Sequence, residues 1–213
     1  MPLSRRHLFT FAASAGAAIG TAALVASWPT TGAAAAATVG QPAPDFAVVD
    51  TGGQVRKLGD FRGKIVVLEW TSPSCPFVGA HYKSGNMQAL QRWATQQGVI
   101  WLSVLSTHPS RSDYLPTPQA AAFNNERNAA PTALLMDEDG KLGMSYGART
   151  TPHMFVVAAD GTLAYAGAID EGPSPDPTTK RNYVRLAIED LMAQRPVKTA
   201  STRSYGCGVG YGG

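Results

Sequence analysis

The sequence has little cysteine: there are two in 213 residues, Cys75 and Cys207. Two thiols are too few for a disulfide-stapled small protein or for a four-cysteine zinc or iron–sulfur site. Charged residues are also scarce, at 15% against 44% hydrophobic residues, which excludes a solvated disordered chain. The net charge of +3 comes without the basic stripe of a dedicated nucleic-acid-binding protein, so no nucleic-acid partner is expected. The composition predicts a globular protein whose two cysteines carry much of its chemistry.

Residues 1–37 have the order of an export signal. Arg5 and Arg6 precede a weakly apolar, Ala/Gly-rich stretch at 11–28 and an alanine run at 33–37, which resembles a twin-arginine signal. The alternative is a membrane anchor, for which the many small and polar residues are a poor match. We therefore expect cleavage near Ala37, no stable membrane span afterwards, and a periplasmic or other extracytoplasmic location where disulfides persist. The remaining 176 residues would carry a net charge of +1.

Residues 38–195 alternate strands and helices and predict one α/β domain, with residues 196–213 as a glycine-rich tail that carries Cys207. Short apolar runs predict buried strands at 65–70, 99–105 and 133–136, and turn sequences predict hairpins at 47–58 and 154–166. Helices are expected at 76–97, with an interruption at Gly85, and at 119–127 and 180–194. This order predicts a mixed central sheet flanked by helices, with an N-terminal hairpin extension.

Cys75 follows the predicted strand 65–70 and a short loop, and Pro76 suits the first position of a helix. A thiol at a helix N-terminus lies near the positive end of the helix dipole, which favours the thiolate. Thiolate is the form that attacks peroxides and disulfides. The alternative is a buried inert cysteine. Pro152 follows a threonine just before a predicted core strand, which is a plausible place for a cis peptide bond; the other interpretation is an ordinary trans proline entering an edge strand.

Several runs together resemble a known family. They are G-Q-P-A-P-D-F at 40–46, L-G-D-F-R-G-K-I-V-V-L-E-W at 58–70, S-C-P-F-V at 74–78, and T-T-P-H-M-F-V-V-A-A-D-G-T-L-A-Y-A-G-A-I-D-E at 150–171. They resemble the redoxins, thioredoxin-fold proteins that include the peroxiredoxins of the alkyl hydroperoxide reductase/thiol-specific antioxidant group and membrane-tethered thiol–disulfide exchange proteins. The ending Y-G-C-G-V at 205–209 resembles the tail of a peroxiredoxin-like subgroup. The resemblance implies a thioredoxin-like fold and a nucleophilic, peroxidatic role for Cys75.

The sequence departs from the family's motifs at informative positions. Val78 stands where a C-x-x-C pair would have its second cysteine, so exchange within one such motif is excluded. Ser72 lies three residues before Cys75, where the peroxiredoxin pattern has Thr or Ser, but Leu68 replaces the proline of that pattern. Pro152 stands where peroxiredoxins have a catalytic arginine. The resemblance implies that Ser72 assists the thiolate by hydrogen bonding and that Pro152 shapes the groove.

Cys207 is the candidate resolving thiol. It lies 13 residues after Gln194, a stretch that spans at most about 43–47 Å, and a globule of this size is about 40 Å across, so the tail can reach Cys75. The alternatives are a permanent disulfide and an unpaired thiol in a frayed tail. We expect a thiol-dependent oxidoreductase that uses a peroxide or a disulfide-containing substrate and an unidentified thiol reductant. The alternatives are a thiol–disulfide exchange protein and a non-catalytic module with a static disulfide.

Two histidines lie near the predicted site. His81 follows Cys75 on the same predicted helix, where it polarises the thiolate or caps a pocket; a soft copper site with Cys75 and Met87 is the weaker alternative, since the three do not share one helical face. His153 either tunes the pKa of Cys75 or, as we rather expect, lies at the surface. No phosphate loop, hydrolase elbow or metal-binding helix motif is present, so no cofactor is predicted.

Overall fold

The computed structural model describes residues 36–174 and 176–212. The predicted signal therefore lies, except for its last two residues, outside the described part of the chain. A five-stranded sheet forms the centre, in the order β5-β4-β3-β7-β8. These strands are β3 (Val66–Trp70), β4 (Ile100–Leu105), β5 (Ala133–Met136), β7 (His153–Val157) and β8 (Leu163–Gly167). β3, β4 and β5 run parallel, whereas β7 and β8 pair antiparallel, so the predicted mixed sheet is confirmed.

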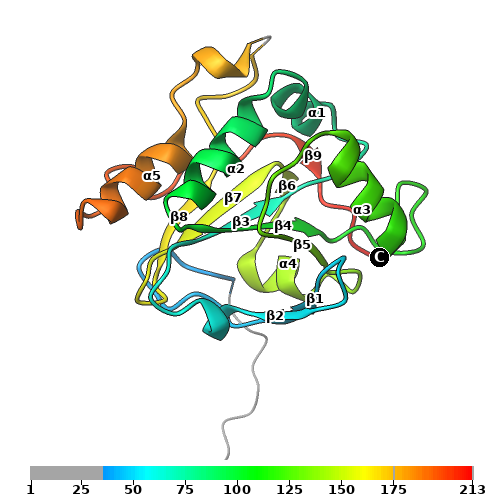
Figure 1. The fold of residues 1–213 in the computed structure, drawn as a ribbon, viewed down its shortest axis with the longest axis horizontal. Helices are drawn as coiled ribbons and strands as arrows, with labels where there is room; N and C mark the ends of the chain where they lie inside the picture. The colour runs from blue at the N-terminus through cyan, green and yellow to red at the C-terminus, as the bar shows by residue number, and fades with distance from the viewer. Residues whose placement is uncertain (1–35, 175, 213) are drawn as a thin grey trace, which may run out of the picture. The chain divides into compact units, whose positions relative to one another are not determined.

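Helices and loops cover both faces of this sheet (Figure 1). On one face lie α1 (Pro76–Lys83), α2 (Asn86–Gln96) and α5 (Tyr183–Met192), which bury a core around Val67, Trp101 and Met154. The other face packs against α4 (Lys141–Tyr146) and the N-terminal hairpin. α3 (Thr117–Glu126) packs against β5 through a small third cluster. This arrangement is a thioredoxin-like fold.

β3 lies in the middle of the sheet, and all five of its residues are buried. Apart from Glu69 they are hydrophobic, which suits a strand that is covered on both faces. Its one charged residue, Glu69, is fully buried and accepts four hydrogen bonds of 2.8–2.9 Å, from the side chains of Tyr82, Gln91, Trp101 and Ser103. A buried carboxylate is costly unless it is hydrogen-bonded, so this network explains how an acid is tolerated in the middle of the sheet. It also ties α1 and α2 to β3 and β4.

The predicted N-terminal hairpin is confirmed as β1 (Ala47–Val49) paired antiparallel with β2 (Val55–Lys57), followed by the short helix η1 (Leu58–Phe61). The predicted break at Gly85 is also confirmed, because this residue has a φ of +77° and separates α1 from α2. A side chain is strained in this left-handed conformation, whereas glycine adopts it freely.

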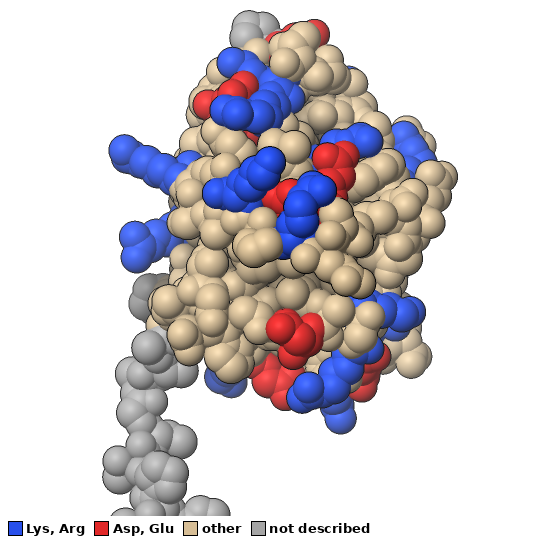
Figure 2. All heavy atoms as spheres, turned by 90° about the vertical axis from the view of Figure 1, so that its left-hand side faces the viewer, with Lys and Arg blue, Asp and Glu red and all other residues tan. Residues whose placement is uncertain are grey.

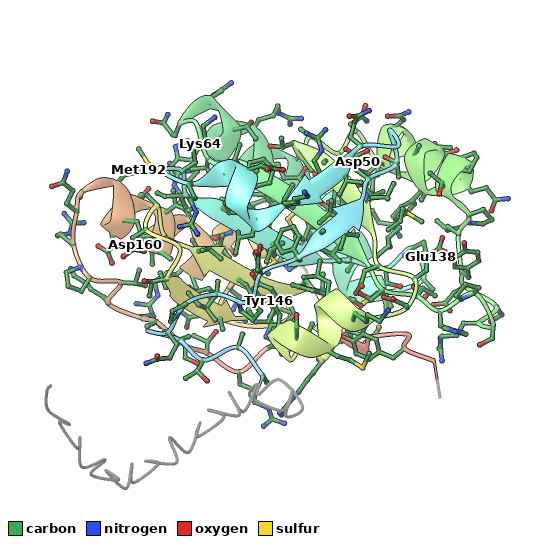
Figure 3. The ribbon with its side chains drawn as sticks, turned by 90° about the horizontal axis from the view of Figure 1, so that it is seen from below. Asp50, Lys64, Glu138, Tyr146, Asp160 and Met192 are labelled. Carbon is green, nitrogen blue, oxygen red and sulfur yellow. The ribbon has the colours of Figure 1, made fainter. Side chains whose placement is uncertain are left out.

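Some elements were not predicted from the sequence. They are α4, the short helix η2 (Pro177–Thr179), and a second small sheet in which β6 (Thr150–Thr151) pairs with β9 (Cys207–Gly208). We expected only a turn before α4, which begins at Lys141; its first N–H groups are capped by the buried Asp137 carboxylate, which accepts from Leu142 and Gly143 at 2.9 Å. Tyr146, at the end of α4, packs on Trp70 and Phe155 beneath the sheet (Figure 3).

On the face drawn in Figure 2, basic and acidic side chains are interspersed and form no continuous patch of one sign. In the described part of the chain, no helix is both long and apolar enough to cross a bilayer.

Candidate active site

Cys75 is the residue immediately before α1, at the end of the loop that follows β3. It has extended backbone geometry, and Pro76 occupies the first helical position, as the sequence indicated. The side chain is 2% exposed. Its Sγ lies 2.9 Å from the carbonyl oxygen of Thr151, to which the thiol donates. The peptide bond from Thr151 to Pro152 is cis, so the predicted geometry at this proline is confirmed.

Cys207 reaches this position through the small second sheet. In the pairing of β6 with β9, Cys207 lies directly opposite Thr151, the residue whose carbonyl accepts from Cys75. Cys207 packs against the buried cluster that contains Cys75, and its thiol and backbone N–H are close enough to the Cys75 sulfur to lower the pKa of that thiol. Both cysteines are free thiols. Two residues 132 positions apart in the sequence are therefore neighbours in the reduced protein.

The two thiols have different pKa values because their surroundings differ. Burial raises the pKa of Cys75, but the neighbouring Cys207 thiol, the Thr151 side chain and the N–H groups of Val78 and Cys207 together bring it below the usual value. Burial raises the pKa of Cys207 to about 11, and the adjoining Cys75 sulfur contributes to this rise. A thiolate therefore forms first on Cys75, the sulfur at the helix N-terminus.

The tail is seated by specific contacts on both sides of Cys207. The Tyr205 hydroxyl donates to Asp170 at 2.5 Å and lies 3.0 Å from the Nε2 of His81. Gly206 has a φ of +132°, and a Cβ at this position would lie 2.7 Å from the carbonyl carbon of Thr151. The close approach of the two backbones thus requires glycine. Farther along, the Tyr211 hydroxyl donates to the carbonyl of Ala148 at 2.9 Å.

Ser72 lies within the loop between β3 and Cys75, and Pro152 follows Thr151, whose carbonyl accepts from the Cys75 thiol. The Oγ of Ser72 is 3.1 Å from the Oγ of Ser74, which in turn donates to Asp113 at 2.8 Å. The hydroxyl that lowers the pKa of the Cys75 sulfur is that of Thr151. It is buried and has no hydrogen-bond partner among the described residues. The assisting role of Ser72 stays a prediction.

The two histidines are both buried. Both ring nitrogens of His81 are occupied, by Tyr205 and, at 2.8 Å, by the Asn86 amide, which favours a structural role over the copper site considered above. The surface location expected for His153 is wrong: it is 8% exposed, because β7 carries it into the sheet beside Phe155. Burial, with a smaller contribution from Arg149, lowers the pKa of His153 to about 4. Neither histidine is among the groups that shift the pKa of Cys75.

Sequence reasoning missed the roles of Thr151, Tyr205 and Gly206 at the site. The only sequence signals were the threonine that precedes Pro152 and the Y-G-C-G run around Cys207. Among residues 36–174 and 176–212, no three His, Cys, Asp or Glu side chains form a group that could hold a metal ion.

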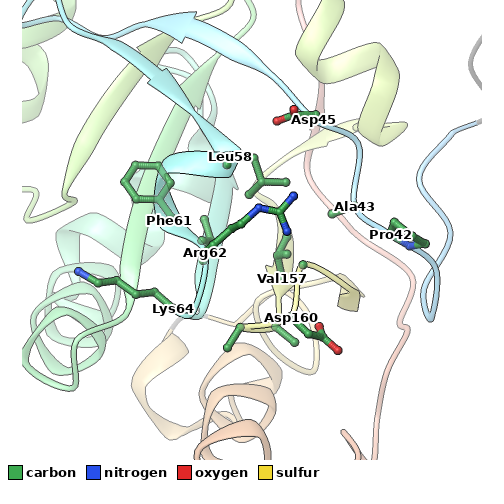
Figure 4. A pocket seen from close by; sticks show the side chains of 14 residues that line it. Pro42, Ala43, Asp45, Leu58, Phe61, Arg62, Lys64, Val157 and Asp160 are labelled. Carbon is green, nitrogen blue, oxygen red and sulfur yellow. The ribbon is translucent and has the colours of Figure 1, made fainter.

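Two cavities flank the Cys75 segment, and a third lies elsewhere. One, of about 370 Å³, is lined by Pro76, Phe77, His81 and Tyr205 among others. Another, of about 450 Å³, is lined by the loop before Cys75, the first helices and the end of α3. The cavity of Figure 4, of about 160 Å³, lies at the first residue of β3 and the last of β7, whereas Cys75 follows the opposite end of β3. It contains no cysteine, serine, threonine or histidine.

Comparisons with known proteins show the family and the fold of the chain. The model of the AhpC/TSA family matches residues 39–166. No curated protein matches the chain. Among solved structures, the chain is similar to an uncharacterized conserved protein from Geobacillus kaustophilus, with 23% identity over 82% of this chain and 93% of that one and a TM-score of 0.73. It is also similar to the peroxidoxin BcpB from Mycobacterium tuberculosis (20% identity, 75% and 99% coverage, TM-score 0.53) and to a putative thiol:disulfide interchange protein DsbE from Chlorobium tepidum (25% identity, 62% and 85% coverage, TM-score 0.50).

Proposed function

Because the chain belongs to the AhpC/TSA family, we propose that it is a peroxiredoxin-like, thiol-dependent oxidoreductase in which Cys75 is the nucleophile and Cys207 the resolving thiol. The observation that carries this proposal is that the pairing of β9 with β6 sets Cys207 opposite Thr151, whose carbonyl accepts from the Cys75 thiol, so that the two cysteines are neighbours. A lone cysteine at a helix N-terminus is compatible with an inert residue. A second thiol placed on it by a tail that is otherwise rich in glycine favours a redox pair.

The proposed reaction has three steps. The Cys75 thiolate attacks one oxygen of a peroxide, the O–O bond breaks, and the departing hydroxide or alkoxide takes a proton from solvent, which leaves a sulfenic acid on Cys75. The sulfur of Cys207 then attacks the sulfenic sulfur, an S–S bond forms, and water leaves with the Cys207 proton. Two electrons have passed from the thiols to the peroxide. An external thiol reductant returns them by exchange through a mixed disulfide.

Thiol–disulfide exchange is the second candidate, and one observation favours it. Pro152 occupies the position where the peroxiredoxin resemblance requires a catalytic arginine, and the nucleophile instead contacts the carbonyl of the preceding residue, Thr151. In exchange, the Cys75 thiolate attacks one sulfur of a substrate disulfide, the substrate S–S bond breaks, and one substrate sulfur leaves as a thiolate. Cys207 then attacks the mixed disulfide on Cys75 and releases the second substrate thiol as the Cys75–Cys207 bond forms. Both candidates use the same pair of sulfurs and differ in the oxidant.

Three further assignments belong to this proposal. Ser72 assists the Cys75 thiolate by hydrogen bonding, Pro152 shapes the groove, and the twin-arginine-like segment at 1–37 directs the protein out of the cytoplasm. The partners are the oxidant, a peroxide or a disulfide-containing substrate, and a thiol reductant. In an oxidising compartment, the Cys75–Cys207 disulfide would be the resting product of each cycle.

A stopped-flow assay tests the proposal. The reduced protein is mixed with hydrogen peroxide in one series and with a mixed-disulfide probe in another, with a thiol reductant present, and unmodified thiols are counted by mass. We expect turnover that is abolished in Cys75→Ala. In Cys207→Ser, a sulfenic acid or mixed disulfide should persist on Cys75. Turnover of the disulfide probe without peroxide consumption supports exchange. Inertness toward both oxidants overturns the proposal and supports a non-catalytic module.

A further inference from the structure

A cavity of about 450 Å³ lies beside the Cys75 loop, and charged and polar side chains form part of its wall. Its volume is in the range of pockets that hold small organic molecules. Ser72, Pro73 and Val78, from the loop and the first turn of α1, form the side nearest Cys75. Val78 packs in the same buried cluster as Cys75. The cavity therefore ends against a residue of the cluster that contains the nucleophile.

Arg127 provides the charge of this cavity. It follows α3, and its guanidinium carbon lies 3.7 Å from the centre of the Tyr82 ring and 4.1 Å from that of Phe123. Its hydrogen bonds go to neutral acceptors only: one nitrogen donates to the Thr71 hydroxyl at 3.1 Å, and two donate to the Asn124 oxygen at 3.2 and 2.7 Å. No carboxylate of the described chain lies within ion-pair distance of Arg127.

The other charges around the cavity do not neutralise Arg127 directly. Glu69 acts on it only at a distance, since its oxygens accept from Tyr82, Gln91, Trp101 and Ser103. Lys83 and Glu126 also line the cavity, and both are exposed. A guanidinium enclosed by two aromatic rings, with spare N–H groups and no acid in contact, is a site for a carboxylate.

Gln88 adds a second recognition group. This side chain lines the cavity and is 7% exposed. Its amide nitrogen donates to the carbonyl oxygens of Tyr82 and Arg127, at 2.9 and 2.7 Å. Its Oε1 is buried and has no hydrogen-bond partner in the described structure. Because a buried acceptor without a partner is costly, this oxygen fits a ligand that brings a donor.

We infer that this cavity binds the carboxylate of a small organic substrate and presents that substrate's disulfide or hydroperoxide group to Cys75. The inference rests on the proposed function and adds the substrate class. Arg127 pairs with the carboxylate, Tyr82 and Phe123 pack against the organic part, and Gln88 accepts a donor. With a disulfide substrate, the Cys75 thiolate attacks one sulfur, the S–S bond breaks, a mixed disulfide forms on Cys75, and the second half leaves as a thiolate.

Two aromatic disulfides that differ in charge test this inference: dithiobis(nitrobenzoate), with a carboxylate on each ring, and uncharged dithiodipyridine. Both are mixed with the full chain carrying Cys207→Ser, so that only Cys75 reacts. Arg127→Gln should lower the rate constant for the anionic reagent about ten-fold, the usual order for one charge-assisted hydrogen bond, and change that for the neutral one by less than about two-fold. Arg127→Lys, which keeps the charge, should lose less. Arg92→Gln removes the same charge from an exposed position on α2 and should leave both rates unchanged.

If the rate constants of both reagents fall equally in Arg127→Gln, or neither falls, the inference is overturned and the role of Arg127 is structural. If neither reagent reacts with Cys75 in the Cys207→Ser chain with Arg127 intact, the inference fails, and the proposed function fails with it only if that chain does not reduce hydrogen peroxide either. Competition does not depend on whether the variant folds: benzoate added with Arg127 intact should slow the anionic reagent and leave the neutral one unaffected. Benzoate without effect on the anionic reagent overturns the inference while the proposed function stands.

Discussion

Replacing Gly206 with alanine tests whether the pairing of the C-terminal tail with β6 controls the formation of the Cys75–Cys207 disulfide. The new Cβ would lie 2.7 Å from the carbonyl carbon of Thr151, whereas ordinary contacts begin at 3.4 Å, so the backbone must retreat by about 0.7 Å or more. Alanine is also strained at a φ of +132°, by about 1–3 kcal/mol. A tenfold change in population corresponds to about 1.4 kcal/mol. The fraction of molecules in which β9 is paired with β6 should therefore fall by about ten-fold or more. Disulfide closure should slow by a similar factor.

The assay follows one turnover. Reduced protein is mixed with one equivalent of hydrogen peroxide, quenched at intervals with a thiol-alkylating reagent, and analysed by intact mass, and a dimedone trap reports the sulfenic acid on Cys75. In Gly206→Ala we expect sulfenic acid to form at the usual rate and to persist. Gly208→Ala is the matched control, because it lies in the same strand β9 and its Cβ would meet no atom within 4 Å. Closure of Gly206→Ala at the rate of the unsubstituted protein, or equal slowing of Gly208→Ala, would refute the reasoning.

Two further predictions concern the buried polar groups around the site. Tyr205→Phe removes the hydrogen bond to Asp170, and hydrogen bonds to charged groups contribute about 1.5–3 kcal/mol. We expect the free energy of unfolding, measured in urea, to fall by about 2 kcal/mol and disulfide closure to slow. Unchanged stability and an unchanged closure rate would contradict this. His153 has a pKa of about 4 in the folded protein, so between about pH 4 and pH 6.5 it is neutral when folded and takes up a proton on unfolding. The free energy of unfolding should therefore decrease by about 3 kcal/mol as the pH falls from 6.5 toward 4. His153→Asn keeps an acceptor for the Arg149 N–H and should show a correspondingly smaller loss over this interval in urea titrations; identical pH profiles would rule this out.

Much of the fold could be predicted because its signals are local. The strands β3 and β4 are short apolar runs, and the structure buries nearly every residue of both. Gly85 divides the first helical region because it alone there adopts a positive φ. The helix start after Cys75 followed from Pro76, whose ring restricts the backbone to helix-compatible values.

Other elements had no comparable local signal. α4 has six residues, too few to show helical periodicity, and depends on the buried Asp137 for its first hydrogen bonds. His153 looked like a surface residue because polarity is a property of the side chain, whereas its burial comes from the pairing of β7 with β3. The two-residue strand β9 forms only because β6 is there to pair with it.

The two cysteines show where the sequence alone stopped. It determined that Cys75 follows a strand and opens a helix, since backbone preferences act over a few residues, and it showed that the tail was long enough to bring Cys207 to it. Only the tertiary structure decided that Cys207 lies on Cys75. That contact depends on the pairing of β9 with β6, the bond from Tyr205 to Asp170 and the absence of a Cβ at Gly206. Each joins residues that are distant in the sequence, and such contacts are fixed by packing and hydrogen bonding across the whole domain rather than by local preference.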